Sequence, residues 1–290
     1  ILPREDSDRV GPRYWPRNQG DPPRRAIVDS FGLATSFARV ILHEYENAPS
    51  ERLNNERANP LGDRGTALFT LETNDGFAFP DQLERLDRLV ADHPDRSIEE
   101  LAAEWWSLTR DHRSRGVGAG IVASTRKSLK NLLEEARDRL RGNQTRAREI
   151  PAPRRRDYLA LPRHGSPDRP RVAFVYPGLG NTFEGMGRRL SVLWPEVLRR
   201  QERANVRFAD QVTRGTFWDR PLPTEFEDHV DLIVGQVVIG SLVTDILRLL
   251  GVVPDAAICY SMAETSALVS LGAWSDRDEL LRRITTSPLF

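Results

Sequence analysis

The chain has 290 residues, enough for one large domain or for two to three small ones. Its 42 basic and 42 acidic residues give a net charge of zero, so the composition offers no case for a nucleic-acid or acidic-membrane partner. The single cysteine, Cys259, excludes an intrachain disulfide and a cysteine-rich zinc site and is typical of a reducing, cytoplasmic setting. We expect no membrane span, because no apolar run reaches the ~18 residues required, and no signal peptide, because the first residues are charged.

The N-terminal part of the chain predicts a loop followed by two strands. Residues 1–25 are rich in proline, arginine and aspartate and predict an extended loop. Residues 24–46 hold two short apolar runs with Gly32 and small residues between them, which predicts a strand, a loop and a strand. Residues 47–65 are polar and turn-forming, so they predict a connector.

The stretch from residue 47 to 147 predicts a small α+β domain. Its expected elements are strands at 67–73 and 116–125 and helices at 79–93, 97–109 and 128–140. Ser97, followed three residues later by Glu100, is typical of a capping box at the start of the second helix. Of the adjacent Trp105 and Trp106, we expect one in the core and the other at an interface. Residues 148–170 contain five prolines and an arginine cluster, and predict a wrapping linker without a core of its own.

The last part of the chain alternates between strand-like and helix-like stretches. The expected elements are a buried strand from 171 into a Pro-Gly-x-Gly turn, a helix with a break at 194–195, a buried central helix at 231–251, a second buried strand ending at 259, and a tightly packed helix after 262. Such alternation predicts a doubly wound or hydrolase-like α/β sheet.

Ser261 lies where the second of these strands turns into a helix. A nucleophile elbow places its serine at such a turn and has glycines two residues before and two residues after it. Here these positions hold Cys259 and Ala263, which are both small. The following amide would lie at a helix N-terminus, where it could stabilise an oxyanion. The turn alone leaves open that Ser261 is an ordinary core serine.

Two motifs in this region resemble the acyltransferase domains of type I polyketide and fatty acid synthases. The segment RVAFVYPGLGNTFEGMGRRL matches their opening at Pro177, Gly178, Gly180, Gly185, Met186 and Gly187. The segment GVVPDAAICYSMAETSALVSLGAW matches their nucleophile motif at Pro254, Asp255, Ser261, Glu264, Ala267, Gly272 and Ala273. The two motifs occur in the family's order and at a fitting separation.

The resemblance implies a role for each candidate residue. It makes Ser261 the acyl-accepting nucleophile and the amides of Met262 and Leu179 the oxyanion hole. Leu179 stands where the family has a glutamine, a change that a main-chain donor tolerates. Gln236, Gly178 and Gly180 would contribute to substrate binding, and no metal ligands are implied.

Residues 24–42 resemble the end of a ketosynthase domain, and the whole chain then follows the family's domain order. The implied domains are a ketosynthase tail at 1–46, an α+β linker domain at 47–147, a wrapping linker at 148–170 and the N-terminal part of an acyltransferase at 171–290. The implied fold class is α/β, a truncated hydrolase-like acyltransferase core with a small α+β linker domain. The Tyr-Pro-Gly turn and the Ser-Pro-Leu-Phe ending are closer to polyunsaturated fatty acid and glycolipid-type synthases.

The resemblance implies a fragment of a multidomain synthase that transfers an acyl group from acyl-CoA to the phosphopantetheine arm of an acyl carrier protein. It implies no bound cofactor, a cytoplasmic location, the remaining synthase domains as partners, and a homodimer formed through the ketosynthase. One alternative is a degenerate ketosynthase–acyltransferase didomain that serves as a docking scaffold. Another is an α/β-hydrolase or thioesterase, which the linker domain and the Pro-Gly-x-Gly strand disfavour.

The sequence departs from the family pattern at several points. Residues 34–37 replace the glycine-rich loop of the ketosynthase site. Thr286 stands where an arginine would bind a malonyl carboxylate, and Arg282 and Arg283 lie about one helical turn away. The family's catalytic histidine is expected beyond Phe290.

Overall fold

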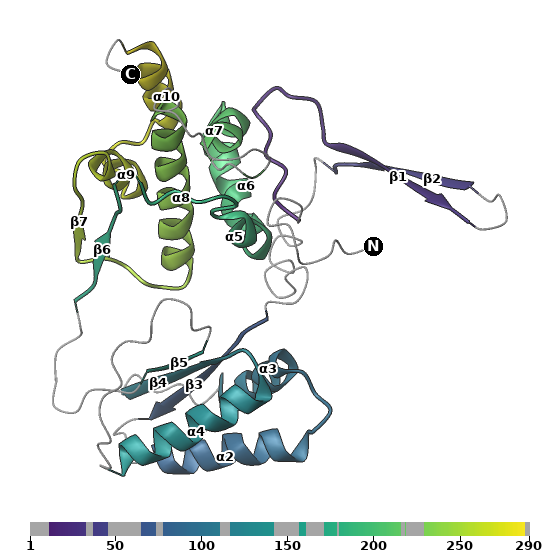
Figure 1. The fold of residues 1–290 in the computed structure, drawn as a ribbon, viewed down its shortest axis with the longest axis vertical. Coiled ribbons are helices and arrows are strands. Elements are labelled where there is room, and N and C mark those ends of the chain that lie inside the picture. The colour runs from purple at the N-terminus through teal and green to yellow at the C-terminus, as the bar shows by residue number, and fades with distance from the viewer. Residues whose placement is uncertain are drawn as a thin grey trace. The chain divides into compact units, whose positions relative to one another are not determined.

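The computed structural model describes residues 12–32, 37–45, 65–73, 78–110, 117–141, 157–160, 171–178, 180–215, 218 and 229–287. Its contacts divide the chain into two compact units. One unit combines residues 1–61 with 170–290, and the other comprises residues 62–169 (Figure 1). The domain boundaries expected from the sequence stay predictions. Of the replaced loop at 34–37, only Phe37 is among the described residues.

The unit of residues 62–169 is built on a three-stranded antiparallel sheet. Its strands are β3 (Ala67–Thr73), β4 (Val117–Ala123) and β5 (Tyr158–Ala160), in the order β3-β4-β5. The predicted pairing of the first two strands is confirmed, with Ala67 opposite Ala123. β5 was not predicted. It lies in the expected wrapping linker, whose remaining residues, apart from Asp157, lie outside the described part.

Three helices cover one face of this sheet, as predicted. They are α2 (Phe79–Asp92), α3 (Ile98–Thr109) and α4 (Arg126–Leu140). Alternate residues of β3, such as Phe69 and Leu71, are buried in one core with the leucines of these helices, whereas Leu68 between them is exposed. The capping box of Ser97 and Glu100 is present at the start of α3.

The other unit begins with an extended segment and a hairpin. β1 (Arg25–Phe31) pairs with β2 (Phe37–His43) in antiparallel register, so the predicted strand-loop-strand is confirmed. Nearly every residue of both strands is exposed, including the apolar ones on each face. Residues 12–24 form neither helix nor strand, in line with the predicted extended loop.

Helices make up most of the same unit. They are α5 (Arg188–Leu193), α6 (Pro195–Ala204), α7 (Phe208–Gly215), α8 (His229–Leu249), α9 (Ala263–Ser270) and α10 (Arg277–Thr286). The predicted break falls at Trp194, with Pro195 as the first residue of α6. A second, unpredicted break precedes α7, where the carboxylate of Asp278 accepts hydrogen bonds from the amides of Val206 and Arg207. α10 was not predicted as an element, and Asp276 caps its first turn.

The apolar α8 is the central helix of this unit, as predicted, and lies between α7 and α9 (Figure 1). Among the described residues, one stretch, Val230–Leu249 within α8, is long and apolar enough by length and composition to cross a membrane. Two-thirds of that apolar stretch is nevertheless buried within the protein. Gly240 of α8 faces α9, and a Cβ there would lie 3.4 Å from Ser270 Oγ.

The second sheet of this unit is parallel and, in the described part, has two strands. β6 (Ala173–Val175) pairs with β7 (Ala256–Ile258). The prediction that both strands are buried is wrong, since Val175 is 69% and Ile258 58% exposed. Burial depends on what covers each face, and only the face that carries Phe174 packs against described helices. The sequence pattern of an apolar strand does not distinguish these two environments.

Candidate active site

Ser261 occupies a sharp turn between β7 and α9, as predicted. Its φ is 57°, and among the described residues it is the one non-glycine residue with a positive φ. The left-handed conformation costs an L-residue about 1–2 kcal/mol, so the surrounding contacts must hold it in place. Two main-chain hydrogen bonds close the turn, from Ala263 N to Tyr260 O (3.2 Å) and from Glu264 N to Ser261 O (3.0 Å). The side chain of Ser261 is exposed.

The two positions that replace the usual glycines differ in their surroundings. Ala263 is fully buried and packs in one cluster with Phe174, Tyr176 and Ala267. Cys259 is half-buried beside this cluster. The close packing leaves no room for a larger side chain at position 263, which explains why this position holds a small residue.

The loop after β6 runs beside the Ser261 turn. The Tyr176 amide donates to the carbonyl of Ile258 (2.9 Å), which extends the strand pairing by one residue. A Cβ on Gly178 would lie 3.6 Å from the carbonyl oxygen of Tyr260, so the two main chains come close at that point. Gly180 has a φ of 92°, which favours glycine.

Asn181 was not among the predicted site residues. Its side chain donates to the Gly178 carbonyl (3.0 Å) and closes the loop. Leu179, the predicted second oxyanion donor, lies outside the described residues. The prediction that the Ser261 side chain faces this loop therefore stays a prediction.

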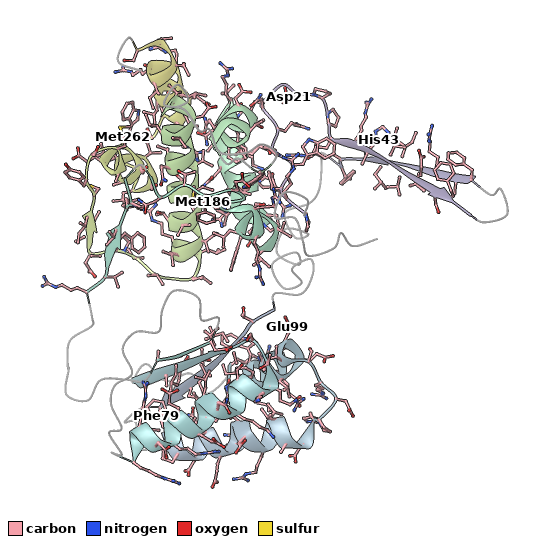
Figure 2. The ribbon with its side chains drawn as sticks, viewed as in Figure 1. Asp21, His43, Phe79, Glu99, Met186 and Met262 are labelled. Atoms are coloured by element: carbon pink, nitrogen blue, oxygen red, sulfur yellow. The ribbon has the colours of Figure 1, made fainter. Side chains whose placement is uncertain are left out.

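Met262 lies directly before the first residue of α9 (Figure 2). Its N–H donates no hydrogen bond to any other described residue. Unsatisfied amides at a helix N-terminus carry partial positive charge and suit a developing negative charge. This amide is therefore free to serve as an oxyanion donor, which is the role predicted for it.

Gln236 is buried on α8, and its side-chain nitrogen donates to Thr182 Oγ1 (3.0 Å). Thr182 follows the Gly178–Gly180 loop, so this hydrogen bond connects the central helix to the loop. The sequence did not reveal Thr182, because the contact joins residues 54 positions apart. The predicted site residues Gly178, Gly180 and Gln236 thus gather around one loop.

A cleft of about 480 Å³ lies between β6 and α8 and reaches this loop. Its walls are mostly apolar, with Val175, Ile239, Val243 and Leu247 among them, and Gln236 contributes polar atoms. The lining includes no Asp, Glu, Lys, Arg or His among the described residues. Two larger clefts in the unit, of about 880 and 700 Å³, have neither Ser261 nor Gln236 in their described lining, and the larger one is lined in part by Arg282 and Thr286.

Two of the arginines of α10 are engaged with a neighbouring carboxylate. Arg282 and Arg283 both donate to Glu279 at 2.7 Å, and these hydrogen bonds lower the pKa of Glu279 to about 2. Thr286 donates its hydroxyl to the Arg282 carbonyl one turn earlier (2.8 Å). Thr286, at the position where the family pattern has an arginine, is thus hydrogen-bonded to the main chain of its own helix.

No described side chain hydrogen-bonds to the hydroxyl of Ser261. Of the five histidines, His43 lies on the hairpin and His93 in the other unit. The side chains of His112, His164 and His229 lie outside the described residues. A general base for Ser261 is therefore not found in the part of the chain that the structure describes.

Comparison with known proteins points to polyketide synthases. The chain is 32% identical over 278 residues to polyketide synthase GfsA of Streptomyces halstedii, an alignment that covers 92% of this chain and 3% of that protein. It is 28% identical over 272 residues to erythronolide synthase EryA3 of Saccharopolyspora erythraea. That alignment covers 92% of this chain and 8% of the relative, so the chain spans a small part of both proteins. No family model matches the chain.

The fold comparison points in the same direction. The solved acyltransferase domain of ZmaA superposes with a TM-score of 0.50 at 16% identity, over 77% of this chain and 48% of that one. This likeness confirms the predicted fold class, a partial α/β acyltransferase core. The relatives are polyketide synthases and the fold is that of part of an acyltransferase domain, in line with the resemblance seen in the sequence.

Proposed function

We propose that this chain carries the nucleophile of an acyltransferase that moves an acyl group from acyl-CoA to the phosphopantetheine thiol of an acyl carrier protein. The observation that carries the proposal is the strained Ser261 turn, with φ of 57° and a free Met262 amide beside it. Strained backbone is retained where the surrounding structure forces it, and such positions are concentrated at active sites.

The geometry suits acyl transfer in two steps. In the first, Ser261 Oγ attacks the thioester carbonyl, its proton passes to a base, and coenzyme A leaves as the thiol after protonation. The amide of Met262 donates to the oxyanion of the tetrahedral intermediate, and Leu179 is the second donor in this proposal. In the second step, the carrier thiol attacks the acyl-serine ester, and Ser261 regains its proton. The base comes from residues outside those described, which agrees with the histidine that the resemblance predicts after Phe290.

The proposal extends to the architecture of the parent protein. Residues 1–46 would be the C-terminal tail of a ketosynthase and residues 47–147 the α+β linker domain. Residues 148–170 would be the wrapping linker, and residues 171–290 the N-terminal part of the acyltransferase. Its partners would be an acyl carrier protein and the other synthase domains, with a homodimer through the ketosynthase, and the acyltransferase would hold no bound cofactor. The likeness to polyunsaturated fatty acid and glycolipid-type synthases, and a cytoplasmic location, belong to the same proposal.

The direct test is covalent labelling of the full-length protein. Incubation with isotopically labelled acyl-CoAs is expected to add one acyl mass to the peptide that contains Ser261, and addition of the carrier protein is expected to remove it. Absence of this mass with every acyl-CoA, short and long, would contradict the proposal.

The acyl group of the donor is expected to carry no carboxylate on the carbon next to the thioester. Acetyl-CoA and longer saturated acyl-CoAs should acylate Ser261 with a kcat/KM at least about 100-fold above that of malonyl-CoA, because burying an unpaired carboxylate costs several kcal/mol. The described lining of the apolar cleft offers no cation, and Glu279 engages Arg282 and Arg283. Competition between labelled donors measures the ratio.

A matched variant sharpens this prediction. Thr286→Arg restores a cation at the position where the family pattern has one, and it should raise the malonyl rate while leaving the acetyl rate within about threefold. A wild-type preference for malonyl-CoA would show that the carboxylate is bound by a cation outside the cleft lining and α10.

A second candidate function is a docking scaffold without catalysis. The observation that favours it is that no described side chain hydrogen-bonds to Ser261, while Cys259 and Ala263 replace the usual glycines. The labelling experiment separates the two functions, since a scaffold forms no acyl-serine.

A further inference from the structure

Residues 12–24, here called the strap, complete the corner between α6 and α7. The first amides of a helix need acceptors outside the helix, and a side chain just before the helix usually supplies one. The residue before α7 is Arg207, whose side chain has no acceptor. Instead, Asn18 Oδ1 accepts from the amides of Ala209 (2.9 Å) and Asp210 (3.3 Å). A residue 191 positions away in the sequence thus caps this helix.

The strap also contacts α5 and the end of α6. The Gln19 amide donates to the carbonyl of Val206 (2.8 Å), and the Gln19 side chain donates to the carbonyl of Arg203 (3.0 Å). The Tyr14 amide donates to Ser191 Oγ (3.0 Å), and the Tyr14 ring packs against the core of α6, α7 and α8. The last carbonyls of a helix need donors in the same way as its first amides need acceptors. The strap therefore satisfies groups on both sides of the corner.

A four-charge network joins the strap, the base of the hairpin and α6. Arg24 donates to Glu202 Oε2 on α6 (2.5 Å) and to Glu44, which follows β2 directly. Arg17 pairs with Glu44 as well (2.9 Å), and the Tyr14 hydroxyl donates to Glu202 (3.1 Å). Two cations and two anions balance, and the side chains of Arg24 and Glu202 are each 17% exposed. Partial burial protects such pairs from screening by salt.

The protonation states suit this network. Burial alone would raise the pKa of Glu44, but the Arg24 amide and the charges of Arg24 and Arg17 lower it below its usual value. Burial and the neighbouring Glu202 raise the pKa of Tyr14, so its hydroxyl remains a donor. At neutral pH Glu44 is therefore a carboxylate and Tyr14 keeps its hydroxyl proton, as their contacts require.

We propose that the strap is a docking segment that locks the hairpin β1–β2 onto the α6–α7 corner. Arg24 precedes β1 and Glu44 follows β2, so both ends of the hairpin enter the network. α7 packs on α8, the helix that carries Gln236. The strap thereby holds the hairpin β1–β2, and any domain that the hairpin belongs to, at a fixed position relative to the candidate active site. This inference stands independently of the proposed acyl transfer.

Amide hydrogen exchange on the full chain tests the cap. Asn18→Ala is expected to speed exchange at Ala209 and Asp210 about fivefold or more, the effect of losing an N-cap. Asn18→Asp keeps an acceptor at the helix N-terminus but loses the donor that Asn18 Nδ2 offers to Asp210 Oδ1 (3.1 Å), so exchange at these amides should fall between the unchanged chain and Asn18→Ala. Asp29→Asn, which breaks an exposed ion pair on the hairpin, is the control and should leave α7 unchanged.

A distance measurement tests the lock itself. Spin labels are attached to cysteines that replace the exposed Ser30 and Thr213, in a Cys259→Ser background. Double electron–electron resonance should then give one narrow distance distribution between the two labels. Asn18→Ala combined with Glu202→Gln should broaden it. A broad distance distribution in the unchanged chain would overturn the proposal. Amide exchange rates in α7 that do not change in Asn18→Ala would do the same.

Discussion

Replacing Ser261 by glycine is expected to abolish acyl transfer and, at the same time, to stabilise the fold. Removal of the nucleophile should lower the rate of acyl-serine formation and of transfer by at least about 10³-fold. Glycine adopts a φ of 57° without the cost of about 1–2 kcal/mol that serine bears. Glycine also makes the unfolded chain more flexible, which offsets about 0.4–1 kcal/mol of this stabilisation. The free energy of unfolding should therefore rise by a net amount of roughly 0.5–1 kcal/mol.

Ser261→Ala is the matched control for this prediction. Alanine also lacks the hydroxyl, so transfer should fall as far, but it keeps the Cβ and therefore the backbone strain. Chemical denaturation of both variants and of the unchanged protein measures the difference in the free energy of unfolding. If the glycine variant were less stable than the alanine variant, or if the alanine variant still formed the acyl-enzyme, Ser261 would not be a strained nucleophile.

The sequence predicted the features that depend on neighbouring residues. The capping box of Ser97 and Glu100 and the break before Pro195 each rest on residues within one turn of a helix, and both are present. The Ser261 turn was predictable for the same reason, since a strand, small flanking residues and a helix follow each other within a few positions. The pairing of β3 with β4 followed from two strand-like stretches in one small unit.

The features that were missed depend on residues far apart in the chain or on what covers a surface. Nothing near α7 indicates that Asn18 caps it, because the contact spans 191 positions. β6 and β7 have the composition of buried strands, yet Val175 and Ile258 are exposed, because composition does not report the number of covering layers. The Gln236–Thr182 hydrogen bond was not predicted either, although Gln236 itself was, because its two residues are 54 positions apart.

The largest loss of stability is expected from Trp105→Ala in the unit of residues 62–169. Trp105 is 2% exposed, lies in the core between the sheet and its helices, and donates its indole N–H to the carbonyl of Thr70 (2.7 Å). Truncating a buried tryptophan costs about 3–5 kcal/mol, from lost burial and from the cavity that remains. A unit of this size has a total stability of roughly 5–15 kcal/mol, so the change should unfold a measurable fraction of it.

The adjacent Trp106 provides the control, since it has the same side chain on the same helix and is 43% exposed. Trp106→Ala should cost at most about 1 kcal/mol. Amide exchange in β3 and β4 reports the difference, and equal effects of the two variants would contradict the assignment of Trp105 to the core. Acyl-serine formation should persist in both variants, because the described contacts of the Ser261 turn come from β6, β7 and α9 in the other unit. Loss of acylation in Trp105→Ala alone would instead show that the two units depend on each other.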